Sequence, residues 1–297
     1  MFKESDNFDV ERGVFHWRPT AWLRVSGDDA ASFLQGQFTN DLRALVPGKG
    51  VYGLWLNHKG RVVADSFVLQ GAGGEFWVGS YFCPAVVIKE RLEAFIIADD
   101  VVVEDVTSEW SAVTLFGADA ETLPAATHGG LIFAGRRTCG LHREFAFPSA
   151  ELVSVTSQWA GWRQWDAQAI ERVRIQSGIP AVPVDLGPTE LPNEGGLEHD
   201  AISFTKGCYL GQEVMARLKS MGQVRRRLLR VRGRGEPPAR GATLYQAARR
   251  IGEMRTSVSL GDGFIGWALL TLLSLRAEDP LSLLEEGGGE SIWVERP

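Results

Sequence analysis

Apolar and polar positions alternate through Leu23 and Val25 with the two-residue period of a half-buried strand, and further apolar runs follow at 51–56 and 62–69. Residues 57–60, Asn-His-Lys-Gly, interrupt this pattern. Asparagine and glycine both tolerate the positive φ angles of a hairpin turn. The expected strands are 22–25, 51–56, 62–69, 76–78 and 101–103, and helical patterns occur at 30–34 and 84–95. We therefore expect a mixed α+β region that contains a β-hairpin.

The middle of the chain continues this series and then becomes rich in proline. A strand at 112–117 opens a second strand and helix series, which runs through the glycines around 129–135. An amphipathic helix is expected at 165–176, ended by Gly178. Prolines at 180, 183, 188 and 192 then predict an extended loop. A long loop inside a compact domain is more often functional than accidental.

Beyond Gly222 the composition changes: arginines are interleaved with aliphatic residues up to Arg234. Short strands are expected at 228–231, 251–258, 264–270 and 291–294, separated by glycine and proline turns. Repeated short strands of this kind favour a small antiparallel barrel. We place the last domain boundary near residue 222, which divides the chain into 1–222 and 223–297.

Composition places the chain among soluble globular proteins. Its 297 residues are 44% hydrophobic and 23% charged, and that length suggests two or three domains. The longest apolar stretch, 264–275, is shorter than the roughly 20 residues that span a bilayer, so no membrane partner is expected. Acidic residues stand at 4 and 6, where a signal peptide is basic and then apolar, so the default expectation is a cytoplasmic protein.

The cysteines and histidines argue against a resident metal. Cys83, Cys139 and Cys208 are odd in number and form no C-x-x-C pair, so neither a disulfide framework nor a structural zinc site is indicated. The five histidines contain no pair at i and i+4. We predict no permanently bound metal.

Several common catalytic motifs are missing from the sequence. It contains no P-loop, no G-x-G-x-x-G after a strand and no G-x-S-x-G. Chemistry driven by nucleotides and serine hydrolysis are therefore poor candidates. A cysteine hydrolase using Cys208 and His199 stays open, because nine residues of separation do not fix their geometry.

The segment from Lys206 to Glu213, KGCYLGQE, has the strongest chemical signal. Gly207 and Gly211 let the backbone turn tightly or approach a ligand closely. Lys206 is placed to stabilise the thiolate of Cys208, the form of cysteine that attacks or ligates. The alternative is that Cys208 is a buried residue that only fills space.

A basic segment follows, with eight Lys or Arg residues and no acid between Arg217 and Arg234, in a chain whose net charge is −6. Three explanations stay open. The arginines could blunt an edge strand, bind a polyanionic ligand, or contact nucleic acid. The local field has the opposite sign to the net charge, so it could also steer an anion toward Cys208.

KGCYLGQE, with its flanks, resembles the signature of the YgfZ-type folate-binding proteins. These are relatives of the glycine-cleavage T-protein and of mitochondrial proteins that help to build iron–sulfur clusters. Weaker similarities cover most of the chain in order, at 33–41, 57–65, 174–180, 190–194 and 251–257.

The resemblance implies two interleaved α+β lobes with antiparallel sheets and a folate cleft in 1–222, followed by a small β-barrel in 223–297. It also implies a folate-binding accessory protein of iron–sulfur cluster assembly or repair, supporting iron–sulfur enzymes that include tRNA-modifying ones. Tetrahydrofolate is then the expected cofactor. The expected partners are iron–sulfur client or assembly proteins, with a possible contact to tRNA.

The resemblance also assigns the site residues. Cys208 is expected to act as a redox-active or transiently ligating thiolate, activated by Lys206. The rest of the motif, Gly207, Tyr209, Gly211, Gln212 and Glu213, is expected to shape and position the loop. The residues expected to bind folate are Asn57, Asp65, and Arg217 toward its glutamate tail.

The sequence departs from the T-protein pattern at two points. The T-protein hairpin carries two adjacent acids near the reactive folate nitrogen, whereas this chain has Ala64 and Asp65. A counterpart of the T-protein R-x-G-Y-x-G-E segment is also missing. A folate-dependent transferase of aminomethyl or methyl groups is therefore the alternative function, and a solvated hairpin acid is the alternative role for Asp65.

Overall fold

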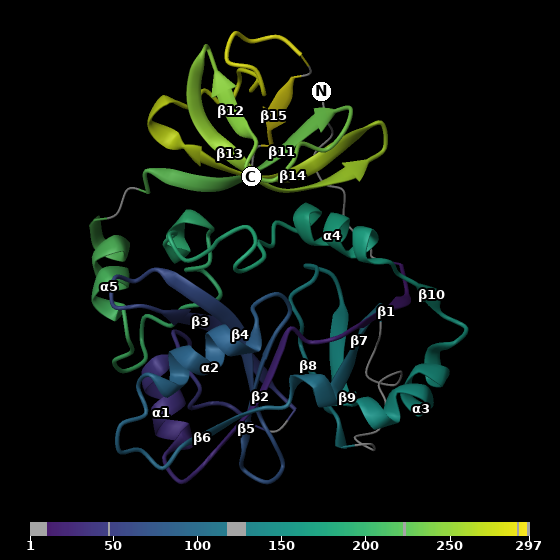
Figure 1. The fold of residues 1–297 in the computed structure, drawn as a ribbon, viewed down its shortest axis with the longest axis vertical. Helices are drawn as coiled ribbons and strands as arrows, with labels where there is room; N and C mark the ends of the chain where they lie inside the picture. Colours follow the sequence, from purple (N-terminus) through teal and green to yellow (C-terminus); the bar gives the residue numbers. More distant parts are fainter. Residues whose placement is uncertain (1–10, 47, 118–128, 222–223, 290, 296–297) are drawn as a thin grey trace.

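The computed structural model describes residues 11–46, 48–117, 129–221, 224–289 and 291–295. Three five-stranded sheets organise these residues, as Figure 1 shows. Two of the sheets, with their helices, form the lower part of the view, and the third forms a curled sheet above them.

The first sheet has the strand order β3-β4-β5-β2-β6 and is antiparallel throughout. Its core against the helices contains Leu23, Val68 and Val78 from the strands, with Leu34 and Ile88 from the helices. The elements are β2 (Ala21–Ser26), α1 (Ala30–Gln37), β3 (Gly50–Leu56), β4 (Val62–Gln70), β5 (Phe76–Ser80), α2 (Ala85–Glu93) and β6 (Val102–Asp105). These are the strands and helices that the hydrophobic pattern predicts for this part of the chain.

The second sheet has the order β10-β1-β7-β9-β8. Its first strand in the chain, β1, precedes the whole first sheet and pairs with β7, which follows it. The two lobes are therefore interleaved. The elements are β1 (Gly13–Trp17), β7 (Trp110–Phe116), β8 (Leu131–Phe133), β9 (His142–Pro148), α3 (Leu152–Thr156) and β10 (Arg163–Gln164).

An aromatic core joins the two sheets. Trp22 of the first sheet lies 5.4 Å from Trp110 and 6.2 Å from Phe133 of the second, measured between ring centroids. Phe67 of β4 contacts Phe133 in the same way, at 5.1 Å. This interface uses the face of the first sheet opposite its helices. Both faces of β4 are therefore covered, and most of its residues are buried.

The C-terminal sheet has the order β12-β13-β14-β11-β15 and curls on itself. Isolated bridges from Tyr245 to Ser282 and from Leu281 to Ile292 bring β12 toward β15, around a core that includes Val231, Met254 and Phe264. The strands are β11 (Arg226–Arg234), β12 (Thr243–Gln246), β13 (Arg249–Leu260), β14 (Gly263–Thr271) and β15 (Ile292–Val294). The expected α+β class with a small C-terminal barrel-like sheet is confirmed.

Two helices lie next to this sheet. Helix α4 (Ala167–Gln176) is capped by Asp166, which accepts a hydrogen bond from the Ala169 amide at 2.7 Å, and its Ile175 packs among apolar residues of β11, β13 and β14. Helix α5 (Gln212–Met221) precedes β11 in the chain and lies to the left in Figure 1. The boundary expected at residue 222 lies outside the described residues, so the division into 1–222 and 223–297 stays a prediction.

Some expectations from the sequence are wrong. Strand β7 agrees with the strand expected at 112–117, and the glycines at 129–135 flank strand β8; residues 118–128 lie outside the described residues, so the helix expected in this series stays a prediction. The sequence reasoning also missed strands β1, β8, β9, β10 and β12. Strand β11 is not an edge strand, since β14 and β15 flank it.

Ion pairs between arginines of this sheet and buried glutamates attach the C-terminal sheet to the rest of the chain. Arg226 Nε lies 3.0 Å from Glu194 Oε1, and Arg255 Nη2 lies 3.1 Å from Glu190 Oε1. Arg230 donates to the carbonyl oxygen of Gln176 at the end of α4. Several arginines of the basic segment are thus engaged within the molecule, which limits the edge-strand and anion-binding explanations. None of the helices in the described residues has the length and apolar character needed to cross a bilayer.

Candidate functional site

Cys208 is exposed, on the loop that leads into α5. The C-terminal end of this loop rests on the β3–β4 hairpin turn. Gly211 has φ +87°, and a Cβ atom there would lie 3.0 Å from the Asn57 carbonyl oxygen and 3.2 Å from Leu56 Cβ. Only glycine combines this left-handed conformation with this close approach. Gly207 has neither constraint, because no heavy atom lies within 4 Å of the position its Cβ would take.

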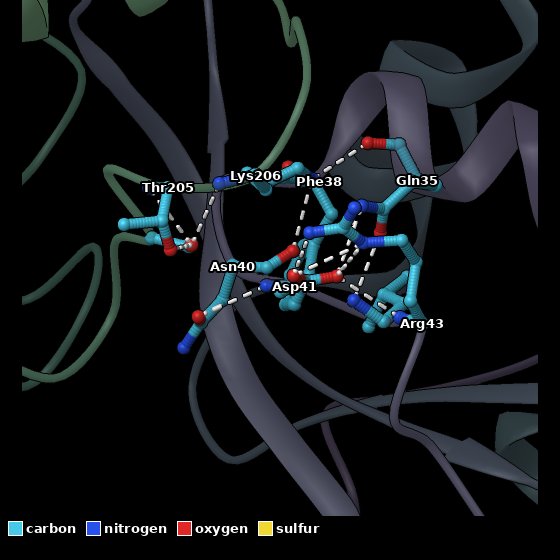
Figure 2. Close-up of polar contacts among 9 residues, drawn as sticks. Gln35, Phe38, Asn40, Asp41, Arg43, Thr205 and Lys206 are labelled. Carbon is cyan, nitrogen blue, oxygen red and sulfur yellow. Dashed lines mark hydrogen bonds and ion pairs between the residues drawn. The ribbon is translucent and has the colours of Figure 1, made fainter.

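Lys206 lies inside the protein, with 5% of its surface exposed. Its Nζ donates hydrogen bonds to the carbonyl oxygens of Gln35, Phe38 and Asn40, at 2.6, 2.6 and 3.0 Å. Figure 2 shows the side chain directed at this turn, which follows α1. An ammonium group has three N–H donors. In this conformation all three are used, so Lys206 has no donor left for the thiol of Cys208.

The other motif residues have different environments. Tyr209 is buried in an apolar cluster with Leu56 and Met215, and its hydroxyl has no hydrogen-bond partner in the structure. Burial raises the pKa of Tyr209 to about 12. Gln212 begins α5 half-buried, whereas Glu213 is exposed one residue later, where its negative charge suits the positive N-terminal end of the helix.

Asn57 shapes the hairpin turn. Its Oδ1 accepts hydrogen bonds from the backbone amides of Lys59 and Arg61, at 2.9 and 3.0 Å. This is the local side-chain to backbone bonding that favours asparagine in turns. Arg217, the third residue expected to bind folate, is exposed on the second turn of α5.

Asp65 is a buried carboxylate on β4, with 5% of its surface exposed. Ser80 Oγ donates to Oδ1 at 2.8 Å, and the Tyr52 hydroxyl donates to Oδ2 at 3.0 Å. Burial raises the pKa of Asp65 to about 6, although both hydrogen bonds act in the opposite direction. A solvated hairpin acid is therefore the wrong description. Each carboxylate oxygen has two lone pairs and accepts one of these bonds, so Asp65 can accept further hydrogen bonds from a ligand.

The neighbouring position faces away from this carboxylate. Ala64 is fully buried in the core between the first sheet and its helices, together with Trp55. Successive side chains of a strand point to opposite faces. An acid at position 64 would thus lie in an apolar core, and the substitution of alanine for the first T-protein acid agrees with this packing.

Arg136 and Asp200 lie beside Asp65. The Arg136 guanidinium carbon is 4.4 Å from the centre of the Tyr52 ring, and its Nη2 forms an ion pair with Asp200 Oδ2 at 2.8 Å. The positive charge of Arg136 also lowers the pKa of Asp65, against the larger effect of burial. A carboxylate, an aromatic ring and a cation are thus grouped at this position.

A second buried carboxylate, Glu144 on β9, differs from Asp65 because its acceptor capacity is filled. Tyr81 and Thr114 donate their hydroxyls to it at 2.7 Å, and Trp17 donates its indole N–H at 3.1 Å. Arg137 Nε lies 3.5 Å from it. We interpret Glu144 as a structural acid that joins the strands of the second sheet to Tyr81.

Segment 38–41 connects the Cys208 loop to the Asp65 group. On one side, the carbonyl oxygens of Phe38 and Asn40 accept from Lys206, and the Thr39 carbonyl oxygen accepts from the Ser203 amide at 3.0 Å. On the other side, Asn40 Nδ2 donates to the carbonyl oxygens of Tyr52 at 2.9 Å and Asp200 at 3.0 Å. A displacement of this segment would therefore change the hydrogen bonds of both the Cys208 loop and the Asp65 group.

Sequence reasoning missed several residues of this site. Tyr52, Ser80, Arg136 and Asp200 surround Asp65 but come from β3, β5 and two loops. Only the tandem Arg136-Arg137 after a glycine gave a local signal. Across the described ranges, no group of three or more histidine, cysteine, aspartate or glutamate side chains is arranged to hold a metal ion.

Comparisons with known proteins show what this chain is similar to. Residues 3–129 match the family model of the GCVT N-terminal domain. The chain is 29% identical over 277 residues to the mouse mitochondrial iron–sulfur cluster assembly factor IBA57, with 84% of this chain and 75% of that protein covered. It is 25% identical over 297 residues to the tRNA-modifying protein YgfZ of Sodalis glossinidius, with 93% and 89% covered.

The fold is also that of a solved structure. The glycine cleavage system aminomethyltransferase T from Bartonella henselae superposes with a TM-score of 0.78 at 17% sequence identity. The superposition covers 96% of this chain and 85% of the other. At that identity the likeness is one of fold.

Proposed function

We propose that this chain, whose residues 3–129 match the GCVT N-terminal domain, is a folate-binding accessory protein of iron–sulfur cluster assembly or repair. In this role it supports iron–sulfur enzymes, including those that modify transfer RNA. Relatives that are similar over most of its length carry the names iron–sulfur cluster assembly factor and tRNA-modifying protein.

One structural observation supports this function most directly. The exposed thiol of Cys208 is on a loop held by segment 38–41, and the same segment holds Tyr52 and Asp200 beside the buried carboxylate of Asp65. A group that exchanges clusters or electrons must be accessible, whereas a group that recognises a heterocyclic ring must be enclosed. The two requirements are met on opposite sides of one segment.

Asp65 and its neighbours offer polar groups of the kind that a pterin ring would bind. The lone pairs that Ser80 and Tyr52 leave free on Asp65 can accept the N–H groups of a pterin ring. Arg136 supplies a cation beside this position, and the exposed Arg217 is available to the glutamate tail. Tetrahydrofolate, when bound, supplies a reduced pterin that can carry one-carbon units.

The thiol of Cys208 is proposed to act as a transient ligand or redox group toward an iron–sulfur client or assembly protein. As a thiolate, cysteine is the usual protein ligand of such clusters. The Cys208 loop supplies one thiolate, whereas a permanently bound cluster usually has four cysteine ligands. One thiolate therefore suits the transfer or repair of a cluster. Cys83, in contrast, is buried, and burial raises its pKa to about 12, so it is unsuited to this chemistry.

Complementation tests the thiol with a control from the same chain. We expect Cys208→Ala to abolish rescue of a strain that lacks its own family member, with no change in folding. Cys139→Ala removes the other exposed cysteine and should leave rescue intact. Full activity of the Cys208→Ala protein would refute the role of the thiol.

Calorimetry with tetrahydrofolate tests the ligand. Asp65→Ala should weaken binding by about 10-fold or more, because a charged hydrogen-bonding partner is lost. Cys208→Ala should leave binding unchanged. A wild-type protein that shows no heat of binding at millimolar ligand would refute the folate proposal and leave the thiol proposal to its own test.

The alternative function is a folate-dependent transfer of aminomethyl or methyl groups. The GCVT N-terminal domain and the aminomethyltransferase fold favour it, whereas the buried Ala64 in place of an acid does not. Turnover of a one-carbon donor by purified protein with tetrahydrofolate would establish it. Its absence, with rescue retained, would support the accessory role.

Contact with tRNA and a cytoplasmic location remain parts of the proposal. Three arginines of the basic segment, Arg226, Arg230 and Arg232, pair with acids of this chain, so any phosphate contact would use their neighbours. Such a contact predicts tRNA binding that weakens steeply with salt. Lack of binding at low salt would remove tRNA from the partners.

A further inference from the structure

Lys206, which is distant in the sequence, caps the C-terminal end of helix α1 with its ammonium group. Helix α1 ends at Gln37, and the last carbonyl groups of a helix have no partners within it. Gln35 O belongs to this last turn, and the carbonyl oxygens of Phe38 and Asn40 follow in the turn after it (Figure 2). A cation is favoured there because the carbonyl end of a helix carries partial negative charge.

The charged groups around this ammonium compensate one another. Asp41 and Arg43 form a two-point ion pair, with Nη2 to Oδ2 at 2.5 Å and Nε to Oδ1 at 2.9 Å. The Tyr209 ring centre lies 5.4 Å from Lys206 Nζ. Burial lowers the pKa of Lys206 to about 8, and Asp41 acts in the opposite direction. The ammonium is therefore held chiefly by backbone carbonyl oxygens.

The loop that carries Cys208 is fixed at its two ends. At the first end, Lys206 is bonded to the turn after α1, and its amide donates to Ser203 Oγ at 3.2 Å. At the second end, Gly211 packs on the hairpin turn. Between them, Cys208 is exposed and Gly207 has open space where a side chain would be.

We propose that Lys206 is a positioning residue, which presents Cys208 by attaching its loop to the end of α1, and that it does not ionise the thiol. The importance of this role rests on the function proposed for Cys208. In this role the ammonium has a structural task, because its three donors are directed at the carbonyl oxygens of Gln35, Phe38 and Asn40.

Cysteine alkylation followed against pH separates positioning from ionisation. The measurement uses the full chain carrying Cys139→Ala, so that Cys208 is the one exposed cysteine among the described residues. Lys206→Met keeps the length of the side chain and removes its charge. Lys219→Met is the matched control, since Lys219 is exposed on α5 and packs on the Phe204 ring at 4.1 Å, beside the same loop.

We expect Lys206→Met to leave the pKa of the Cys208 thiol unchanged, within about 0.2 units, while amide exchange across 203–210 accelerates by about 10-fold or more. Lys219→Met should change neither. Lys206→Arg should behave like Lys206→Met, because a planar guanidinium cannot direct three donors at converging carbonyl oxygens.

The opposite result would overturn the proposal. If Lys206→Met raised the pKa of the thiol by about 0.5 units or more and left exchange unchanged, Lys206 would act through its charge. If the variants fail to fold, the wild-type chain supplies the test. Its exchange at 203–210, corrected for the intrinsic effect of pH, should accelerate between pH 7 and 9 as the ammonium loses its proton, and constant protection would refute positioning. Neither readout needs folate or a cluster, so failure here is distinct from failure of the proposed function.

Discussion

Replacing Asp65 by asparagine should make the stability of this protein less sensitive to pH. Burial raises the pKa of Asp65 from 3.8 to about 6. Between about pH 4 and pH 6 the native protein therefore retains a proton that the unfolded chain has released. The stability that belongs to the protonated form is complete below about pH 4 and is lost as the pH rises through 6. Two pKa units correspond to about 3 kcal/mol of unfolding free energy.

The amide of asparagine has the same shape and does not titrate, and the hydroxyls of Ser80 and Tyr52 can still hydrogen-bond to it. Urea unfolding of both proteins should be measured from pH 4.5 to pH 7.5. The free energy of unfolding of Asp65→Asn, minus that of the wild type, should rise by about 2 kcal/mol across this range. Taking this difference cancels the pH dependence that comes from the titratable groups that the two proteins share.

The exposed Asp262→Asn makes the same chemical change at the surface and is the control. A difference between Asp65→Asn and the wild type that stays constant with pH would refute the reasoning, because Asp65 would then ionise in the native protein as it does in water. It would also remove the enclosed carboxylate on which the folate proposal depends.

Three further predictions concern stability and can be measured by chemical denaturation. Gly211→Ala should destabilise the protein by about 1 to 2 kcal/mol or more, because Gly211 has a positive φ and contacts the hairpin turn. Gly207→Ala should change stability by less than about 0.5 kcal/mol. Equal effects of the two substitutions would contradict the difference between the two glycines. Tyr209→Phe should be neutral or stabilising by about 1 kcal/mol, since it removes a buried hydroxyl without a partner, and a large loss would reveal a partner. Asp185→Asn should cost about 1 to 3 kcal/mol, because the buried Arg174 loses one charged partner at 2.7 Å but keeps its ion pair with Glu171, and no measurable loss would contradict that interpretation.

Local patterns were sufficient for most of the first sheet and for α4. The two apolar runs of β3 and β4 and the Asn57 to Gly60 turn between them are properties of adjacent residues, so the hairpin can be predicted from them. Strand β1 could not be placed in this way. It pairs with β7, nearly a hundred residues later, and no local pattern specifies such a partner.

The site was predictable in part. The Cys208 motif and Asp65 stand out in the sequence, but Tyr52, Ser80 and Arg136 reach Asp65 only after separate elements have packed together. The role of Lys206 also changed. Its position two residues before Cys208 suggested activation of a thiol, yet burial directs its ammonium to carbonyl oxygens more than 160 positions earlier.

By itself, the sequence determined the α+β class, the hairpin and the C-terminal sheet, and it predicted a reactive character for the Cys208 motif, because periodicity, glycine freedom and residue chemistry are local properties. Only the tertiary structure decided that Cys208 is exposed, that Asp65 is enclosed and that one segment, 38–41, supports both. The physical reason is that burial and hydrogen-bond partners depend on which distant elements pack together, and these two quantities set the pKa of Asp65 and the direction of the Lys206 ammonium.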